Sequence, residues 1–236
     1  MLDLQAQVEK DPKKIAALFN AIARRYDRVN ALLSFGLNKY WSRRCIQEIL
    51  RKGAPESFVD LCGGTGEITR RLKRHCSLKR TVVVDFSAGM LEVGRKIASD
   101  IETIEANVCQ VPLKSALFDC AAMAYGIRNV DDRPAALKEA LRLLKPGGRF
   151  VILELTRPNN VLLRYGHRLH LKLFVPLLGK IATTRGSAYT YLSQSVEEFI
   201  EPARLQQELK EAGFKAIEAI PLSGGIAALF TATKPA

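Results

Sequence analysis

The sequence has no long hydrophobic run. Nowhere among its 236 residues do the roughly 18 to 20 consecutive apolar residues occur that a membrane-spanning helix needs. The first residues, MLDLQAQVEKDPKK, also lack the apolar centre of a secretory signal peptide. We therefore expect a protein that stays in the cytoplasm.

Metal-binding and disulfide patterns are missing as well. The five cysteines are scattered without a C-x-x-C pair, and their odd number does not fit a complete set of disulfides. His167 and His170 are three positions apart, but no third ligand accompanies them. The sequence predicts reduced thiols and no metal site.

Aromatic residues are few, and acidic residues are outnumbered by basic ones. An aromatic content of 7% does not favour a nucleic-acid surface built from stacking side chains. The 36 Lys and Arg residues against 24 Asp and Glu give a net charge of +12. This charge indicates an anionic partner, but it does not choose between nucleic acid, a membrane surface and a charged cofactor.

Apolar periodicity divides the chain into four parts of one domain. Residues 1–54 are interpreted as a helical cap, because apolar positions recur every three or four residues on either side of the turn SFGLN. Residues 55–155 alternate short strands with helices, which predicts a parallel sheet covered on both faces. Residues 156–196 lack strand signals and are interpreted as an insertion, and residues 197–236 return to a helix and strands. We expect an α/β fold.

A glycine-rich turn follows the first strand of this pattern. In DLCGGTGEIT the strand ends at Asp60, and a helix begins after Gly64, Thr65 and Gly66, so that backbone N–H groups can approach a ligand closely. Asp85 ends the next strand and can accept hydrogen bonds from both hydroxyls of a ribose. The pair predicts a nucleoside site, and a turn that serves only packing is the simpler alternative.

The glycine spacing distinguishes two kinds of nucleoside. The dinucleotide motif G-x-G-x-x-G would need glycine or alanine where this chain has Thr69. The segment matches instead the pattern D-x-x-x-G-T-G of methyltransferases that use S-adenosylmethionine. Asn107 and Val108, which follow the strand IETIEA, are placed to bracket the adenine, although an isolated Asn is also a common turn residue. We expect S-adenosylmethionine as the cofactor.

A second polar cluster follows the strand in FDCAAMAYGIRNVDD. This strand runs to Tyr125, and Arg128 and Asn129 come after it, at the edge where ligands bind in open α/β sheets. We expect Tyr125 beside the cofactor and the next two residues facing the substrate. The alternative for Arg128 is a surface ion pair with Asp131 or Asp132.

Five segments together resemble one known family. IAALFNAIARRYDRVNALLSFGLNKYW, DLCGGTGEIT, AYGIRNVDD, LKPGGRFVILELTRP and LSGGIAALF are similar to the family that methylates the quinone ring in menaquinone and ubiquinone biosynthesis. The resemblance covers about Ile15 to Phe230. It implies a class I S-adenosylmethionine-dependent methyltransferase with a Rossmann-like, mainly parallel seven-stranded sheet, N-terminal helices and an insertion after the fifth strand.

The resemblance also implies a reaction. Family members convert demethylmenaquinol to menaquinol, and in some organisms they methylate a 2-methoxy-6-polyprenyl-benzoquinol. It implies that Arg128 and Asn129 face the quinol. The chain departs from the family at Cys62, where a small residue is usual, and at Val108 and Cys109, where the family usually has N-A-E.

For the cofactor, the resemblance implies one role for each part of the ligand. Thr65 and Gly66 would line its methionine end, and Asp85 would hold its ribose. Asn107 and Val108 would flank its adenine.

Methylation of a ring carbon makes a demand on the site. A hydroquinone is a carbon nucleophile only to the extent that its hydroxyl has lost a proton. Because an arginine stays protonated, we expect Arg128 to stabilise the developing phenolate, and Asn129 to fix that oxygen or a water that accepts the proton. Tyr26 and Asp27 either close over the cofactor as a lid or belong to a helix that packs on the core.

One further absence concerns acidic residues. No Asp or Glu occurs from Leu155 to Val196. The same segment carries six cations, Arg157, Arg164, Arg168, Lys172, Lys180 and Arg185. Interleaved with apolar residues, they suit an anionic membrane surface, where a polyprenylated quinol resides. The alternative is that the apolar residues pack on the sheet and the cations are solvated.

Two rival functions stay open. Nucleic-acid methylation fits the charge, but AYGIRN contains neither the N-P-P-[YF] motif nor the Pro-Cys pair of such enzymes. A nucleotide-binding module without catalysis is the other.

The partners expected are a quinol and a membrane surface, and not nucleic acid. The oligomeric state is left open, and a homodimer is one of the possibilities.

Overall fold

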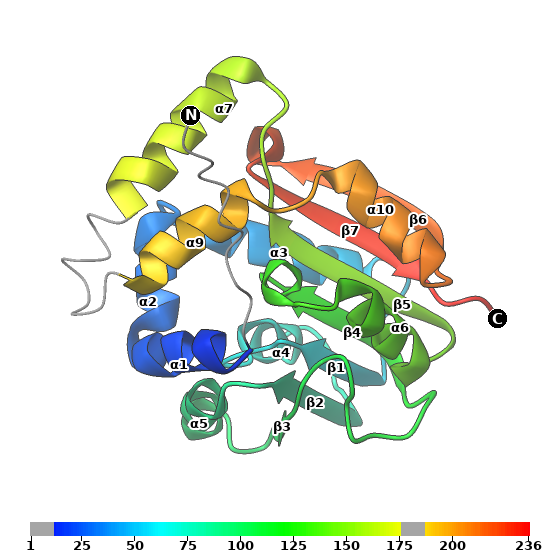
Figure 1. Ribbon diagram of the computed structural model, residues 1–236. Coiled ribbons are helices and arrows are strands. Elements are labelled where there is room, and N and C mark those ends of the chain that lie inside the picture. The colour runs from blue at the N-terminus through cyan, green and yellow to red at the C-terminus, as the bar shows by residue number, and fades with distance from the viewer. Residues whose placement is uncertain (1–11, 176–186) are drawn as a thin grey trace.

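A seven-stranded sheet runs through the part of the chain that the computed structural model describes, residues 12–175 and 187–236 (Figure 1). Its order is β3-β2-β1-β4-β5-β7-β6. The last strand in sequence, β7, is antiparallel to both of its neighbours, and the other neighbouring strands are parallel. The strands are β1 (Ser57–Leu61), β2 (Arg80–Asp85), β3 (Glu102–Glu105), β4 (Phe118–Ala124), β5 (Leu144–Leu155), β6 (Lys215–Leu222) and β7 (Ala227–Thr233). The predicted fold class is confirmed.

The strand order reverses beside β1. From β1 the chain moves outward to β2 and β3, and it then returns to place β4 on the other side of β1. Crossover connections leave β1 and β4 in opposite directions, so a crevice opens at the carboxyl ends of these two strands. The residues that end β1 and β4 therefore face a ligand site rather than a packed loop.

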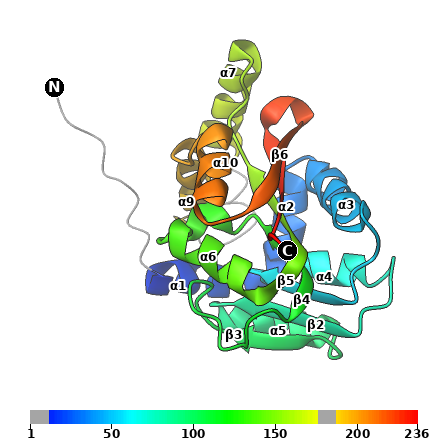
Figure 2. The ribbon, with the colours of Figure 1, turned by 90° about the vertical axis from the view of Figure 1, so that its right-hand side faces the viewer.

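Helices cover both faces of the sheet (Figures 1 and 2). The α-helices are α1 (Pro12–Ile22), α2 (Tyr26–Leu33), α3 (Leu37–Leu50), α4 (Glu67–Leu72), α5 (Ala88–Ile97), α6 (Arg133–Leu143), α7 (Val161–Leu169), α9 (Ser187–Glu197) and α10 (Pro202–Glu211). Alternate residues of one strand serve different faces: Phe58 packs with α3 and α4, while Val59 packs with α6 and α10. Two apolar cores thus form on opposite sides of one sheet.

Short polar side chains begin several of these helices. Ser87 accepts a hydrogen bond from the backbone N–H of Met90 at the start of α5, and Asp132 does the same for Ala135 at the start of α6. Each satisfies a donor that the first helical turn leaves without a partner. The loops that precede these helices are fixed by this capping, and both loops border the crevice.

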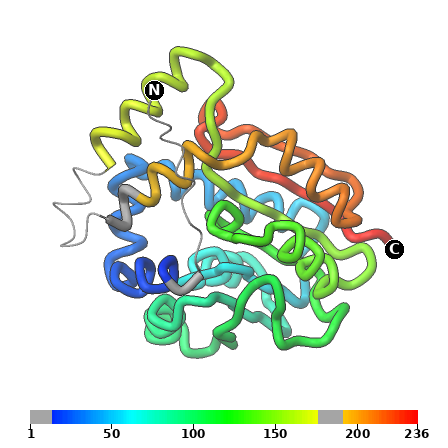
Figure 3. The backbone as a smooth tube through the Cα atoms, viewed as in Figure 1, coloured from blue at the N-terminus to red at the C-terminus, as the bar shows by residue number. Residues whose placement is uncertain are grey.

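The segment after β5 forms α7, a π-helical turn η3 (His170–Phe174) and, after residues 176–186, α9. Lys180 and Arg185, two of the cations noted in the sequence, fall outside the described residues. In Figures 1 and 2 α7 projects away from the sheet, and the tube in Figure 3 shows α9 returning between α7 and the N-terminal helices. Within the described ranges, no helix combines the length and apolar character needed to cross a membrane.

Candidate active site

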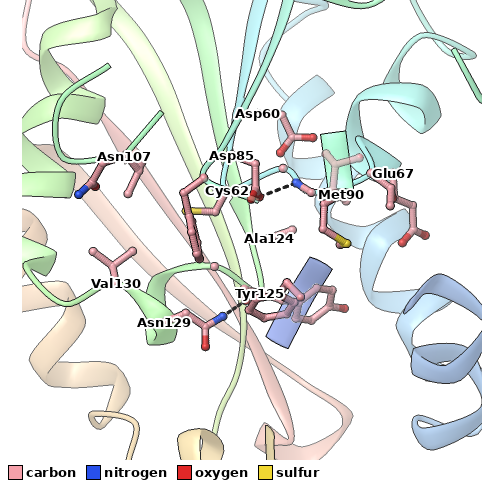
Figure 4. A pocket seen from close by; sticks show the side chains of 18 of the residues that line it. Asp60, Cys62, Glu67, Asp85, Met90, Asn107, Ala124, Tyr125, Asn129 and Val130 are labelled. Atoms are coloured by element: carbon pink, nitrogen blue, oxygen red, sulfur yellow. Dashed lines mark hydrogen bonds between the residues drawn. The ribbon is translucent and has the colours of Figure 1, made fainter. Parts of the chain in front are cut away.

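A cavity of about 360 Å³ lies in the crevice at the carboxyl ends of the strands (Figure 4). It brings together eight residues that the sequence analysis expected at the site: Asp60, Gly64, Thr65, Asp85, Asn107, Val108, Tyr125 and Asn129. Gly66 and Arg128 are not in its wall. The ends of β1, β2 and β4 and the loop after β3 therefore converge as predicted.

Backbone geometry explains the glycines of the first turn. A Cβ atom on Gly63 would lie 2.7 Å from Cγ of Asp60, and Gly64 and Gly66 have φ angles of +55° and +73°. These left-handed values favour glycine. Gly66 precedes the first residue of α4 as its N-cap, so it shapes the turn instead of lining the cavity.

Asp85 is held by the two loops beside it. Its Oδ2 accepts a hydrogen bond from the Gly64 N–H at 2.8 Å, and its Oδ1 accepts one from the Ser87 N–H at 2.8 Å. Burial raises the pKa of Asp85 to about 6, although the backbone N–H groups oppose this shift. Since each carboxylate oxygen has a second lone pair, Asp85 can still accept two hydroxyl hydrogens, as a ribose requires.

Asp60 has one satisfied oxygen and one unsatisfied oxygen. Its Oδ2 accepts hydrogen bonds from the N–H and Oγ1 of Thr69, at 3.3 and 2.8 Å. Its Oδ1 is buried without a partner among the described residues, and burial raises the pKa of this carboxyl to about 7. A buried carboxylate oxygen at a cavity wall suits a cationic group of a ligand, such as the ammonium of a methionine moiety.

The N-terminal helices contact the same loops. The hydroxyl of Thr65 donates to the carboxylate of Asp27, 3.2 Å from Oδ2, and Asp27 lines the cavity. On α1, Oδ1 of Asn20 accepts hydrogen bonds from Oγ of Ser87 at 2.7 Å and from the Gly89 N–H at 2.8 Å. Asn20 was missed by the sequence analysis, because its partners lie 67 and 69 positions away and no local pattern marks it.

In the loop after β3, Asn107 is both a turn residue and part of the cavity wall. Oδ1 of Asn107 accepts the N–H of Cys109 at 2.9 Å, which is the bond of a turn residue. Asn107 also lines the cavity (Figure 4). Val108, which is otherwise buried in the core, lines it as well. The turn thus fixes the orientation of the Asn107 side-chain amide. The Nδ2 group of that amide takes no part in the turn.

A second cavity, of about 340 Å³, adjoins the first. Its wall is mainly apolar and is formed by α1, α2, α3, α7, η3 and α9. Four residues line both cavities: Phe19, Tyr26, Glu67 and Tyr125. Tyr26 packs edge-on against Phe19, with ring centroids 5.8 Å apart, while its neighbour Asp27 faces the first cavity. A polar ligand site and an apolar one therefore meet at two tyrosines.

Arg128 lines this second cavity and is buried. Its Nη1 is 2.5 Å from Oε1 of Glu154 and 2.7 Å from the Tyr125 carbonyl, and its Nε donates to Oγ of Ser195 at 3.3 Å. Burial lowers the pKa of Arg128, but Glu154, Tyr26 and Tyr191 together outweigh it, so that the pKa is raised. The ion pair is therefore internal, and the surface pair with Asp131 or Asp132 is wrong.

Glu154 was missed by the sequence analysis, although a signal was present. It is the single charged residue in the apolar run FVILEL of β5, and its side chain is fully buried. A charge inside an apolar strand requires a partner of opposite sign. Its position predicts a buried cation, which the structure identifies as Arg128.

Asn129 is fixed at both ends of its amide. Its Nδ2 donates to the Tyr125 carbonyl at 3.3 Å, and its Oδ1 accepts the hydroxyl of Tyr191 at 3.1 Å. Tyr191 lies on α9, 62 positions further along the chain. Asn129 faces the first cavity and Arg128 the second, so the two neighbouring residues flank the junction of the cavities.

Two histidines lie at the apolar cavity. His167 and His170 line the apolar cavity, and burial, together with His170, lowers the pKa of His167 to about 4. Among the described residues, no group of three or more His, Cys, Asp and Glu side chains is arranged to hold a metal ion.

A doubly wound sheet with a glycine turn after β1, an acidic residue at the end of β2 and a cavity at the strand reversal defines a class I methyltransferase fold. Solved structures share it. A Thermotoga maritima S-adenosylmethionine-dependent methyltransferase, a possible histamine N-methyltransferase, aligns with a TM-score of 0.67 at 20% identity, covering 93% of this chain and 99% of its own. A putative methyltransferase bound to the *Haloferax volcanii* Trm112 activator aligns with a TM-score of 0.66 at 16% identity, covering 92% and 98%.

The chain belongs to the ubiE/COQ5 methyltransferase family, whose model matches residues 6–234. It is 40% identical to a demethylmenaquinone methyltransferase of Protochlamydia amoebophila, over 95% of this chain and 96% of that protein. A demethylmenaquinone methyltransferase of Clavibacter sepedonicus is 37% identical, over 99% and 95%. The ubiquinone/menaquinone biosynthesis C-methyltransferase UbiE of Pseudomonas savastanoi is 33% identical, over 94% and 90%. The chain is therefore a methyltransferase, and the prediction of S-adenosylmethionine as its methyl donor is confirmed.

Proposed function

We propose that this methyltransferase methylates a ring carbon of a polyprenylated quinol, with demethylmenaquinol as its main substrate. The observation that carries the proposal is the buried Arg128 at the junction of a nucleoside-sized cavity and an apolar one. A quinol is an apolar ring with ionisable hydroxyls, and it needs both an apolar wall and a single cation. The relatives named demethylmenaquinone methyltransferase support this choice.

In this proposal the first cavity holds S-adenosylmethionine, which supplies an electrophilic methyl group when bound. Asp85 accepts the ribose hydroxyls, and Asn107 and Val108 flank the adenine. Asp60, through its unpartnered Oδ1, and Thr65 hold the methionine end. Gly64 contributes to the cavity wall and Gly66 to the shape of the turn.

Tyr125 separates the two cavities. Its backbone has a φ angle of +58°, unusual for a residue with a side chain, and this places the ring in the wall that both cavities share. The next residue must be glycine, because a Cβ atom on Gly126 would lie 2.5 Å from Cβ of Cys62. Tyr125 thus positions the sulfonium end of the cofactor against the quinol ring.

Arg128 stabilises the quinolate through Nη2, the guanidinium nitrogen that makes no hydrogen bond to the described residues. Nε and Nη1 are used by Ser195, Glu154 and the Tyr125 carbonyl, whereas no hydrogen bond within the described residues involves Nη2. A cation beside a phenol lowers its pKa, and a water molecule accepts the proton. Asn129, whose amide is already oriented, holds that water or the quinol oxygen.

The apolar cavity takes the quinol ring and the first part of its isoprenoid tail. Leu33, Leu155, Leu163 and Leu171 are among the residues that line it. This lining supports a hydrocarbon substrate over a nucleobase, whose polar edges would need hydrogen-bond partners. Methylation of RNA, the rival considered from the sequence, is therefore disfavoured.

A 2-methoxy-6-polyprenyl-benzoquinol is the second candidate substrate. Relatives named for both ubiquinone and menaquinone biosynthesis are 33 to 34% identical to this chain, and relatives named demethylmenaquinone methyltransferase are 34 to 40% identical. We also retain the predictions of a cytoplasmic location and of contact between residues 156–196 and a membrane surface.

The test is a transfer assay with labelled S-adenosylmethionine under reducing conditions. A short-chain demethylmenaquinol and a methoxylated benzoquinol of equal chain length are offered separately. We expect label in the naphthoquinol, and none when the oxidised quinone replaces it, because the quinone has no hydroxyl to ionise. Label in the benzoquinol alone would replace the proposed substrate, and label in neither would contradict the proposal.

A further inference from the structure

Two segments without acidic residues meet at the apolar cavity. Residues 28–47 contain no Asp or Glu, and neither do residues 155–196. Nε2 of His170 lies 2.9 Å from the Leu33 carbonyl, and its ring lies 5.2 Å from that of Phe35. The corner between α2 and α3 is thereby joined to the end of α7, more than a hundred positions further along the chain.

Both segments present large apolar side chains to solvent. At the corner, Leu32 is 51% exposed and Phe35 is 73% exposed. On α7, Leu162 is 81% exposed and Tyr165 is 68% exposed. We call this surface the apolar rim; its members are Leu32, Phe35, Leu37, Tyr40, Val161, Leu162, Tyr165, Leu169, Leu173 and Phe174. Apolar residues gathered in this way mark an interaction surface, whereas single exposed ones do not.

The apolar cavity opens to the surface at the rim. Phe35 belongs to the rim and also lines the cavity, so the cavity reaches the surface at the rim. On α7, Leu163 and His167 line the cavity, whereas Leu162 and Tyr165 are exposed. One helix therefore has an inner apolar face toward the cavity and an outer apolar face toward solvent.

Cations predominate among the charges around the rim, and one of them, Arg168, pairs with Glu197 at the end of α9, with Nε and Oε1 3.4 Å apart. Exposed cations occur on both segments, and they are Arg28, Lys39, Arg43, Arg164, Arg168 and Lys172. An apolar patch framed by cations matches the interface of an anionic bilayer, in which apolar side chains enter the acyl region and cations meet the head groups. A second copy of the chain would instead bring like charges together.

We propose that the apolar rim docks on an anionic lipid bilayer and sets the cavity entrance against it, so that a prenylated quinol passes from the bilayer to Arg128 without crossing water. The inference rests on the proposed function for the identity of the quinol. It extends the membrane contact expected for residues 156–196 to the corner between α2 and α3, which supplies four of the ten rim residues.

The first experiment measures flotation of the full chain with phosphatidylcholine vesicles, with or without phosphatidylglycerol, and needs no quinol. Leu32→Gln and Leu162→Gln remove apolar area from the two different segments of the rim, and neither residue lines the cavity. We expect each to weaken binding to the anionic vesicles at least about tenfold. Ile97→Gln is the matched control, because Ile97 is 56% exposed on α5, which contributes nothing to the rim.

The second experiment compares substrates. With a long-chain demethylmenaquinol in anionic vesicles, Leu32→Gln should lower kcat/KM by a similar factor, whereas turnover of a water-soluble short-chain quinol should stay at the wild-type rate. Flotation unchanged in both variants would overturn the proposal, and so would a wild-type dimer in solution that Leu32→Gln dissociates. Vesicle binding without methylation of any quinol would leave the docking surface standing and reject the proposed function instead.

Discussion

Arg128 carries a full charge into the interior together with Glu154. Both side chains are almost completely buried, and their closest atoms are 2.5 Å apart. Removing only the arginine would leave an unpaired buried carboxylate, at a cost of about 3 to 5 kcal/mol in stability. A single Arg128→Ala variant therefore loses activity for two reasons, catalytic and structural, that one assay cannot separate.

The paired variant Arg128→Gln/Glu154→Gln separates the two effects. Both positions then stay polar and neutral, so the fold should persist, while the cation that stabilises the quinolate is gone. We expect kcat to fall by about 100-fold or more, as when a group that stabilises a developing oxyanion is removed. The dissociation constant of S-adenosylmethionine, measured by calorimetry, should change little. A large loss of cofactor affinity would instead assign Arg128 to the cofactor.

Asp85 predicts a pH dependence of cofactor binding. Burial raises its pKa to about 6, and ribose hydroxyls donate to the ionised carboxylate, so a proton and the cofactor compete. Below pH 6 the dissociation constant of S-adenosylmethionine should rise by up to about tenfold per pH unit. Calorimetry between pH 5 and 8 tests this, with Asp85→Asn as the control that should bind weakly and lose the part of the dependence centred near pH 6, while Asp60, whose pKa is about 7, keeps its own. An unchanged pH profile in Asp85→Asn would transfer the effect to another group, with Asp60 the first candidate.

The sign is reversed for the stability of the ligand-free protein. The folded-state pKa of Asp85 lies above the ordinary value of 3.8 for an aspartate. Its contribution to stability is therefore largest at low pH, and it is lost as the pH rises through about 6. Through Asp85, acidification should therefore have two opposite effects. It weakens the binding of the cofactor, and it stabilises the ligand-free fold.

At the scale of elements, α9 links the segment after β5 to the active site. Ser195 accepts a hydrogen bond from Arg128, Tyr191 donates one to Asn129, and Ser193 donates one to the Leu171 carbonyl in η3. Tyr191 and Ser195, four positions apart on one face of α9, therefore orient two candidate catalytic side chains, and Ser193 ties the same helix to the segment that carries the rim.

Tyr191→Phe removes one of these bonds without changing the helix. The Asn129 amide then loses the partner of its Oδ1, so we expect kcat to fall by roughly fivefold to tenfold, as the loss of one net hydrogen bond implies. The affinity for S-adenosylmethionine should be preserved. Tyr165→Phe, at an exposed position of α7, is the control and should leave turnover of a soluble quinol unchanged. Equal effects of both substitutions would argue against a positioning role for Tyr191.

At the scale of the whole molecule, β5 lies between the parallel and antiparallel parts of the sheet. It pairs with β4 on one side and β7 on the other. Phe150 on β5 is fully buried and stacks on Phe214, with ring centroids 5.5 Å apart. The cores on the two faces of the sheet thus share one central strand. We therefore expect the two cores to unfold together, in a single transition.

Phe150→Ala should lower the free energy of unfolding by about 3 to 5 kcal/mol, through lost burial and the cavity left behind. Ile97→Ala, at an exposed position on α5, should change it by less than about 0.5 kcal/mol. Urea unfolding followed by circular dichroism measures both. A loss below 1 kcal/mol for Phe150→Ala would mean that the core repacks around the vacancy.

The fold and most of the cofactor site follow from local sequence, because they depend on where strands end. Parallel strands bring their carboxyl ends to one edge, so Asp60, Asp85, Asn107 and Tyr125 converge whatever the loops do. Glycine spacing in DLCGGTG is equally local, since each φ angle depends on the residue itself. These features required no knowledge of long-range contacts.

Tertiary structure alone decided the partners of the chemical groups. Arg128 finds Glu154 at a separation of 26 positions, Asn129 finds Tyr191 at 62, and Asn20 finds Ser87 at 67. The sequence shows that such residues are polar, but it does not show in which direction packing orients their side chains. The apolar rim has the same origin. Its two halves are each visible in the sequence as stretches without acids, but only the contact of His170 with the corner between α2 and α3 makes them one surface around one cavity.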